Sequence, residues 1–86
     1  SLAITRELDD RVGEASSLGN IGNIYRFLGD YPQALEYQEQ SLALKRELGD
    51  RAGEAIRLGN IGNIYHFLGD YPQALDRKEQ RIELKE

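Results

Sequence analysis

Apolar residues recur along this chain at the spacing of a helix rather than that of a strand. Leu18, Ile21, Tyr25 and Leu28 follow one another three, four and three positions apart, which places them on one face of a helix with 3.6 residues per turn. A strand would require alternation of apolar and polar residues, and this stretch does not alternate. The pattern therefore predicts amphipathic helices.

Turn residues predict where these helices begin and end. Gly29 is suited to the left-handed conformation that ends a helix, and Asp30 can cap the next one, with Pro32 in its first turn and Gln33 reaching back in a capping box. The same residues recur at positions 69–73, and a Gly-Asp pair also stands at positions 49–50. We therefore predict four helices, over Arg11–Leu28, Tyr31–Leu48, Arg51–Leu68 and Tyr71 to near Lys85.

The chain contains an internal repeat of 40 residues. Residues 1–40 and 41–80 are identical at 30 of 40 positions. A repeat of this length is one structural unit that buries its apolar face against its neighbours. We therefore expect a single all-α domain over residues 1–86, with a helix hairpin at 11–48 and another at 51–86. Residues 1–8 match residues 41–48, so they are expected to be the tail of a preceding B helix, as in a chain that begins within a repeat.

The repeats resemble a known family. Leu18, Ile21, Gly22 and Tyr25, their copies 40 residues later, and Ala34 and Ala74 resemble the signature of the tetratricopeptide repeat, which implies antiparallel hairpins stacked as a right-handed α-solenoid. The period of 40 and the two Leu-Gly-Asn triplets are similar to those of kinesin light chains and of Leu-Gly-Asn-rich G-protein-signalling modulators. Gln38 and Lys78 depart from the pattern, because the family has an aromatic residue there. Armadillo and HEAT repeats have similar periods but lack this spacing.

The helical arcs separate an expected core from an expected binding surface. The core is expected to contain Leu18, Ile21, Tyr25, Leu28, Leu35 and their copies Leu58, Ile61, Tyr65, Leu68 and Leu75. Gly22 and Gly62 each cost about 1 kcal/mol of helix propensity relative to Ala, which is understandable if the following helix approaches closely there.

The opposite face of each first helix carries the candidate peptide-binding residues. An Asn amide offers two donors and one acceptor, which is enough to pair with a peptide group. The resemblance implies that these helices line a concave groove, that the asparagines form a ladder along a bound peptide, and that Gly19 and Gly59 leave space for its backbone. Alternatively, the asparagines bond to one another, to neighbouring helices or to water, and the phenylalanines pack between helices. The candidates are Asn20, Asn23, Arg26, Phe27, Asn60, Asn63, His66 and Phe67.

Composition excludes several classes of function. The 86 residues carry a net charge of -4 without a basic block, which argues against nucleic acid as a partner. One His and no Cys leave no paired-His or thiolate metal site and no Cys nucleophile. No apolar run is long enough to span a membrane. We therefore expect a cytoplasmic protein that is not an enzyme and uses no cofactor or metal.

Two functions remain. The first is a scaffold that binds a peptide or partner protein in the groove of the A helices, and the alternative is a structural element that assembles with itself. Two hairpins fall short of the roughly three repeats usually needed for stability, so a homo-oligomer is expected. Because residues 81–86 occupy the same repeat positions as residues 1–6, assembly requires either an open superhelix in which residues 1–6 give way or a closed dimer with exchanged segments. The closed dimer is slightly favoured, since nearly identical repeats make exchange easy.

Overall fold

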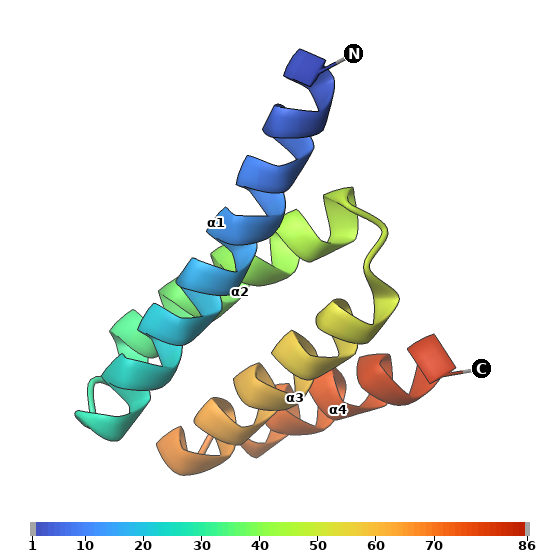
Figure 1. Cartoon of the computed structure of the whole chain (residues 1–86). Helices are drawn as coiled ribbons and strands as arrows, with labels where there is room; N and C mark the ends of the chain where they lie inside the picture. Colours follow the sequence, from blue (N-terminus) through green and yellow to red (C-terminus); the bar gives the residue numbers. More distant parts are fainter. Residues whose placement is uncertain (1, 86) are drawn as a thin grey trace.

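Four α-helices arranged as two hairpins make up the fold. The computed structural model describes the backbone of residues 2–85 and the side chains of residues 7–84. The helices are α1 (Leu2–Phe27), α2 (Tyr31–Glu47), α3 (Arg51–Leu68) and α4 (Tyr71–Lys85). Helices α1 and α2 form one hairpin, α3 and α4 form the other, and α2 packs against α3, with α1 and α3 on the same side of the molecule (Figure 1). The predicted all-α hairpin repeats are confirmed.

The turns between helices use the residues that the sequence indicated. Gly29, Gly49 and Gly69 have φ angles of 80°, 69° and 80°, in the left-handed region that side chains with a Cβ disfavour. The aspartate after each glycine caps the next helix: Asp30 accepts a hydrogen bond from the Gln33 amide, Asp50 from the Gly53 amide and Asp70 from the Gln73 amide.

The predicted start of the first helix is wrong. We expected a helix beginning at Arg11 after a separate tail, but α1 is continuous from Leu2 to Phe27. The reason lies in one difference between the repeats, because Asp9 occupies the position at which the second repeat has Gly49. A left-handed turn at a residue with a Cβ costs roughly 1–2 kcal/mol, so the helix continues through Asp9. The division of the chain into repeats at these positions stays a prediction.

The core lies between α2, α3 and α4, and the predicted core is only partly correct. Leu58 and Ile61 of α3 are fully buried and form a cluster with Leu42 of α2. Helix α3 packs between α2 and α4, whereas α1 packs mainly on α2 and α4 mainly on α3. Residues of the expected core that face outward from these end helices therefore remain exposed, namely Ile21, Leu28 and Leu75, and Leu68 at the last position of α3 is exposed as well.

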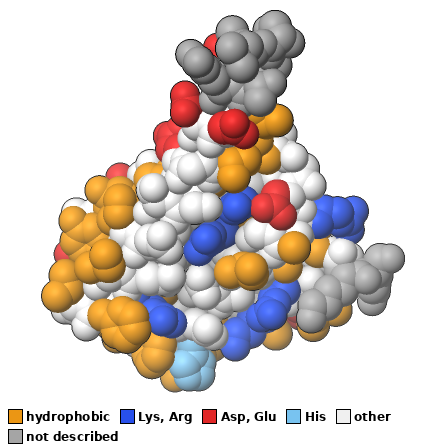
Figure 2. Space-filling model, in the orientation of Figure 1, with side chains coloured by type: hydrophobic (Ala, Val, Ile, Leu, Met, Phe, Trp, Pro, Cys, Tyr) orange, Lys and Arg blue, Asp and Glu red, His pale blue; other side chains and the backbone are white. Residues whose placement is uncertain are grey.

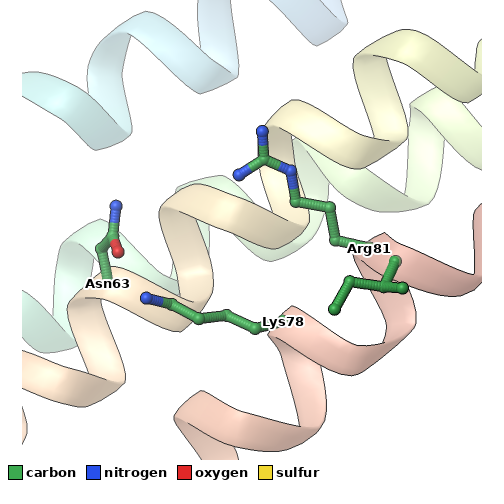
Figure 3. Close-up of a pocket in the computed structure, with 4 residues that line it drawn as sticks. Asn63, Lys78 and Arg81 are labelled. Carbon is green, nitrogen blue, oxygen red and sulfur yellow. The ribbon is translucent and has the colours of Figure 1, made fainter. Parts of the chain in front are cut away.

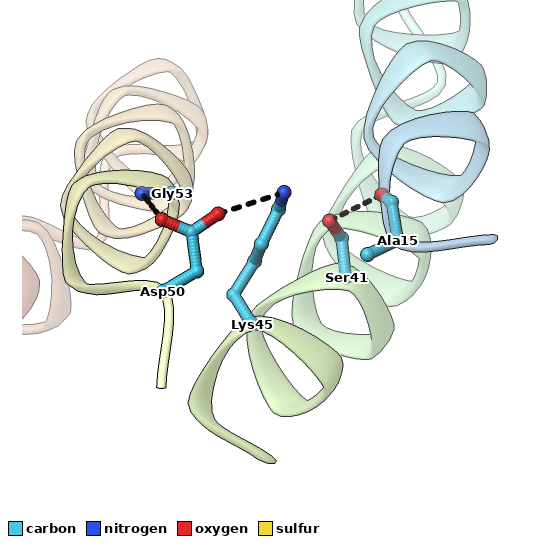
Figure 4. Close-up of polar contacts among 5 residues, drawn as sticks. All are labelled: Ala15, Ser41, Lys45, Asp50 and Gly53. Atoms are coloured by element: carbon cyan, nitrogen blue, oxygen red, sulfur yellow. Dashed lines mark hydrogen bonds and ion pairs between the residues drawn. The ribbon is translucent and has the colours of Figure 1, made fainter. Parts of the chain in front are cut away.

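Buried polar contacts tie the helices together at the end that carries the α2–α3 turn (Figure 4). The Ser41 hydroxyl donates to the Ala15 carbonyl over 2.7 Å, joining α2 to α1. The buried Lys45 ammonium lies 3.1 Å from the Asp50 carboxylate. The hydrogen bond from the Gly53 amide and the contact with Lys45 lower the pKa of Asp50. One carboxylate therefore caps α3 and neutralises a buried cation of α2.

Candidate functional site

All eight candidate residues lie on α1 or α3, the two helices that lie on one side of the molecule in Figure 1. We call this side the A-helix face. Asn20 and Asn63 are exposed, Asn23 and Asn60 are half-buried, and Phe27 is 82% exposed. Phe67 and His66 are exposed and Arg26 is half-buried. None of these residues belongs to the core, which agrees with a surface that is separate from the packed helix faces.

Asn23 belongs to a hydrogen-bond network with the neighbouring helix. The Gln38 amide donates to the Asn23 Oδ1 and to the Gly19 carbonyl, each over 3.1 Å. Arg57 of α3 in turn donates from Nη1 to the Gln38 Oε1 over 3.4 Å. The network therefore links α1, α2 and α3. For Asn23, it matches the alternative in which an asparagine bonds to a neighbouring helix.

The Arg57 side chain occupies the space beside Gly19 that was expected to admit a peptide backbone. Its guanidinium lies against Gly19 where a Cβ would stand, and Arg81 lies in the same way against Gly59, with Nη1 2.8 Å from the Cβ position. The expectation that these glycines leave open space for a peptide backbone is wrong in this structure. They provide space for arginine side chains instead.

The hydrogen-bond donors of Arg57 are only partly paired. Burial lowers its pKa, and the charge of Asp50 opposes this effect. The Arg57 Nε is enclosed and has no hydrogen-bond acceptor among the described residues, and none of the ion pairs in this part of the chain includes Arg57. The enclosed Nε is out of reach of an incoming group, but the guanidinium is half-buried and its Nη1 makes only a long hydrogen bond, so its Nη groups are suited to receive a carbonyl or carboxylate oxygen.

The second repeat has a hollow at the place that corresponds to the contact between Asn23 and Gln38 in the first repeat. The hollow has a volume of about 370 Å³ and is lined by Asn63, Lys78, Arg81 and Ile82. Figure 3 shows the Lys78 ammonium extending from α4 toward Asn63, and the Arg81 guanidinium extending toward α3. Asn23 and Asn63 thus lie in two different settings: Asn23 bonds to Gln38, and Asn63 borders this positively charged hollow.

The close approach expected at Gly22 and Gly62 is confirmed. A Cβ on Gly22 would lie 2.9 Å from the Gln38 Nε2, and one on Gly62 would lie 3.1 Å from the Lys78 Cγ and 3.3 Å from the Ala74 carbonyl oxygen. These distances are shorter than an undisturbed contact allows. The two glycines therefore let the next helix and its polar side chain pack against the first.

Sequence reasoning missed four residues that lie in or beside the A helices: Gln38, Arg57, Lys78 and Arg81. For two of them a signal was present, because Gln38 and Lys78 stand where the resemblance requires an aromatic residue. Such a replacement in a helical interface indicates that a polar side chain is needed there. Arg57 and Arg81 have no repeated counterpart, since Ser17 and Ser41 occupy the equivalent positions, and the 40-residue pattern therefore did not reveal them.

The phenylalanines lie among other aromatic residues at the ends of the A helices. Phe67 stacks on Tyr31 of α2 with ring centroids 5.7 Å apart, and His66 meets the edge of Tyr71 at 5.4 Å. Phe67 thus packs between helices, as the alternative interpretation allowed. Phe27 has the Arg26 guanidinium 5.5 Å from its ring centroid, and it is otherwise the most open large apolar residue of the described part.

The site offers hydrogen-bond donors, positive charge and aromatic surface. Among residues 2–85, no group of His, Cys, Asp and Glu side chains is arranged to hold a metal ion. None of the described helices is long and apolar enough to cross a membrane. In the face seen in Figure 2, Lys and Arg side chains lie between α1 and α3, whereas hydrophobic side chains gather along the edge formed by α1. These groups are suited to binding another polypeptide.

Comparison with known families agrees with the fold. The family model described as tetratricopeptide repeat matches residues 1–47 and 13–86. A search of curated proteins gave no significant match. Tetratricopeptide repeats form non-enzymatic scaffolds that generally mediate protein–protein interactions. With hairpins stacked along the whole chain and a match that spans it, the chain belongs to the tetratricopeptide repeat family.

Proposed function

We propose that the A-helix face binds an extended or helical segment of a partner protein, and that the peptide runs past α1 and α3. The observation that carries the proposal is Arg57, a half-buried cation that forms no ion pair among the described residues. Its Nε is enclosed, so a bound peptide would be received by the Nη groups. A carbonyl or carboxylate oxygen of the peptide would add a charge-assisted hydrogen bond there.

Phe27 supplies an apolar contact on the same helix as Gly19, about two turns away along α1. Aromatic side chains are enriched in protein–protein interfaces relative to the rest of the surface. Together, Arg57 and Phe27 provide a charged group and an aromatic anchor on adjacent A helices. Asn20, Asn60 and Asn63 would add hydrogen bonds to peptide groups, independent of the side chains that the peptide carries.

The test starts from a random peptide library that is selected on the full chain. The affinity of a selected peptide is then measured for the parent and for Phe27→Ala and Arg57→Gln by fluorescence anisotropy. We expect each variant to weaken binding by about tenfold, which corresponds to about 1.4 kcal/mol. Leu8→Ala and Arg11→Gln are matched controls, because both residues are exposed and border a hollow with Glu47 and Leu48 instead of the candidate residues. The affinities of these two variants should equal that of the parent.

Circular dichroism checks that each variant keeps the parent's helix content. If both variants bind the selected peptide within twofold of the parent, the A-helix face is not the binding surface. If the controls weaken binding and the variants do not, the peptide binds the other end of α1. Either result rejects the proposal.

A further inference from the structure

Equivalent residues of α1 and α3 differ sharply in exposure. Ile24 is 58% exposed and its counterpart Ile64 is fully buried; Ile21 is 37% exposed and its counterpart Ile61 is fully buried. The two helices make the same hairpin with the helix that follows. They differ in what precedes them, because α2 packs on α3 and no described element takes that place on α1. We call the uncovered surface, made of Ser17, Ile21, Ile24 and Leu28, the α1 end face.

Helix α4 shows the complementary difference. Ile82 is 58% exposed, whereas its counterpart Leu42 in α2 is 1% exposed. Leu75 is exposed as well, whereas its counterpart Leu35 packs against the core. The surface of α2 that covers α3 therefore reappears on α4 with nothing on it. We call Leu75, Lys78, Arg81 and Ile82 the α4 end face.

We propose that the α4 end face of one copy packs on the α1 end face of a second copy in the way that α2 packs on α3, so that the chain assembles head to tail. The α2–α3 contact within the chain is the template, and the apolar residues on both sides of it are retained at the two ends. This inference is independent of the proposed peptide binding. It names the occupant of both surfaces, which is another molecule of this protein.

The polar residues that differ between the repeats also fit this contact. Within the chain, Arg57 of α3 meets Gln38 of α2. At the contact between copies, Lys78 takes the place of Gln38, and Ser17 takes the place of Arg57. An arginine at position 17 would bring two positive charges together, whereas serine is small, neutral and able to accept a hydrogen bond from lysine. The hollow beside Lys78 (Figure 3) is therefore the place into which Ser17 would fit.

Charge at the edge of the contact between copies differs from that of the template. Within the chain, Glu54 of α3 pairs with Arg46 of α2 over 3.0 Å. Glu14 is the counterpart of Glu54 and lies next to Ser17 on the helix surface. On the other copy, Arg81 stands beside Lys78 on the α4 end face. The counterpart of Arg46 in the second repeat is Glu86, so this ion pair is not retained between copies, and the contact relies on the apolar residues and on Ser17 with Lys78.

The straight course of α1 leaves its end face open. In the second repeat, the chain folds back at Gly49 and α2 covers α3. In the first repeat, Asp9 replaces that glycine and α1 runs on from Leu2, past the end of α2 (Figure 1). Residues 2–10 therefore extend along the axis of α1 and do not occupy the surface needed by α4 of a second copy.

The same features favour an open arrangement over a symmetric dimer of two α4 end faces, and the closed dimer with exchanged segments expected from the sequence stays a prediction. A symmetric pair of α4 end faces would place Lys78 and Arg81 of both copies together, which is a repulsive arrangement. The template contact joins two different faces, and such a contact continues from copy to copy unless the rotation closes a ring.

The experiment compares Ile24→Glu and Ile82→Glu, each of which places a charge in one end face at a position that is exposed in the single chain. Light scattering after size exclusion is recorded from roughly 10 μM to about 1 mM, a range that covers contacts of moderate affinity. We expect the mass of the parent to rise with concentration and each variant alone to stay at 9.8 kDa. An equimolar mixture of the two variants should form a species of two chains, because one intact α4 end face meets one intact α1 end face.

Ile56→Glu is the matched control, because Ile56 is equally open but lies outside both end faces. It should associate like the parent, which shows that the loss in the other variants is not a general effect of removing apolar surface. A parent that stays at 9.8 kDa throughout overturns the proposal. A variant that still dimerises alone, or a mixture that remains single chains, also overturns it, since both results require a contact other than α4 on α1. Peptide binding is measured separately, so its failure has no bearing on these outcomes.

Discussion

Replacing Ile61 and Ile21 by alanine tests how the same residue contributes in two settings of one chain. The two isoleucines occupy equivalent repeat positions within an identical Ile-Gly-Asn-Ile-Tyr segment. Ile61 is fully buried between Leu42 and Leu58, whereas Ile21 lies on the uncovered side of α1. Local helix propensity is therefore matched, and any difference between the two variants reports tertiary packing.

The expected magnitudes follow from burial. Truncation of Ile to Ala removes three carbon atoms, which accounts for about 2.4 kcal/mol at about 0.8 kcal/mol per buried CH₂, and a cavity left in a closed core adds to this. We expect Ile61→Ala to lower the free energy of unfolding by about 3–4 kcal/mol. Ile21 is 37% exposed, so about two-thirds of the transfer free energy applies without an enclosed cavity, and Ile21→Ala should cost roughly 1.5 kcal/mol.

Urea unfolding followed by circular dichroism measures both values, in dilute solution where sizing shows a single chain. A loss of 3–4 kcal/mol can unfold so small a domain, so Ile61→Val and Ile21→Val are measured in parallel. The first should cost about 1 kcal/mol and the second less than about 0.5 kcal/mol. Equal losses at the two positions would refute the assignment of Ile61 to the core and of Ile21 to an open surface.

Four further substitutions test the turns and the buried ion pair. Gly49→Ala should destabilise the chain by about 1–2 kcal/mol through its positive φ alone, because a Cβ there meets no atom within 4 Å. Gly13→Ala also places a Cβ in open space, but within a helix, and should stabilise the chain by roughly 0.5–1 kcal/mol. Thermal melting measures both changes. Asp50→Asn keeps the cap on α3 but leaves the buried Lys45 ammonium without its partner, so it should cost about 1–3 kcal/mol at neutral pH, whereas Lys45→Met should be nearly neutral in urea unfolding. The pKa of Asp50 is below its ordinary value of 3.8 in the folded chain, so the ionised carboxylate stabilises the fold above that pH, and this stabilisation is lost as the pH falls. The parent should therefore lose more stability than Asp50→Asn on acidification. Parallel losses in the two proteins would contradict this linkage.

The sequence by itself determined the elements and their order. The helical spacing of apolar residues, the three left-handed glycines and the aspartate caps are local features, and local backbone preferences suffice to interpret them. The 40-residue repeat added the stacking of hairpins, since a unit of this length cannot bury its apolar face alone. The candidate residues on the A helices were found in the same way, from their position on a helix surface.

Only the tertiary structure decided which copy of each residue is buried. Ile21 and Ile61 have the same neighbours in sequence, and the difference in their burial arises from the presence of α2 on one side of α3. The role of Arg57 was hidden for a similar reason, because its contacts with Gly19 and Gln38 come from the other hairpin. A repeat pattern describes what all units share, whereas the end units and the residues unique to one copy depend on what packs beside them. The straight course of α1 depends on both the sequence and the tertiary structure. The sequence shows that Asp9 stands where the second repeat has a glycine. The consequence, an open face on the first helix, appears only once the helices are placed in space.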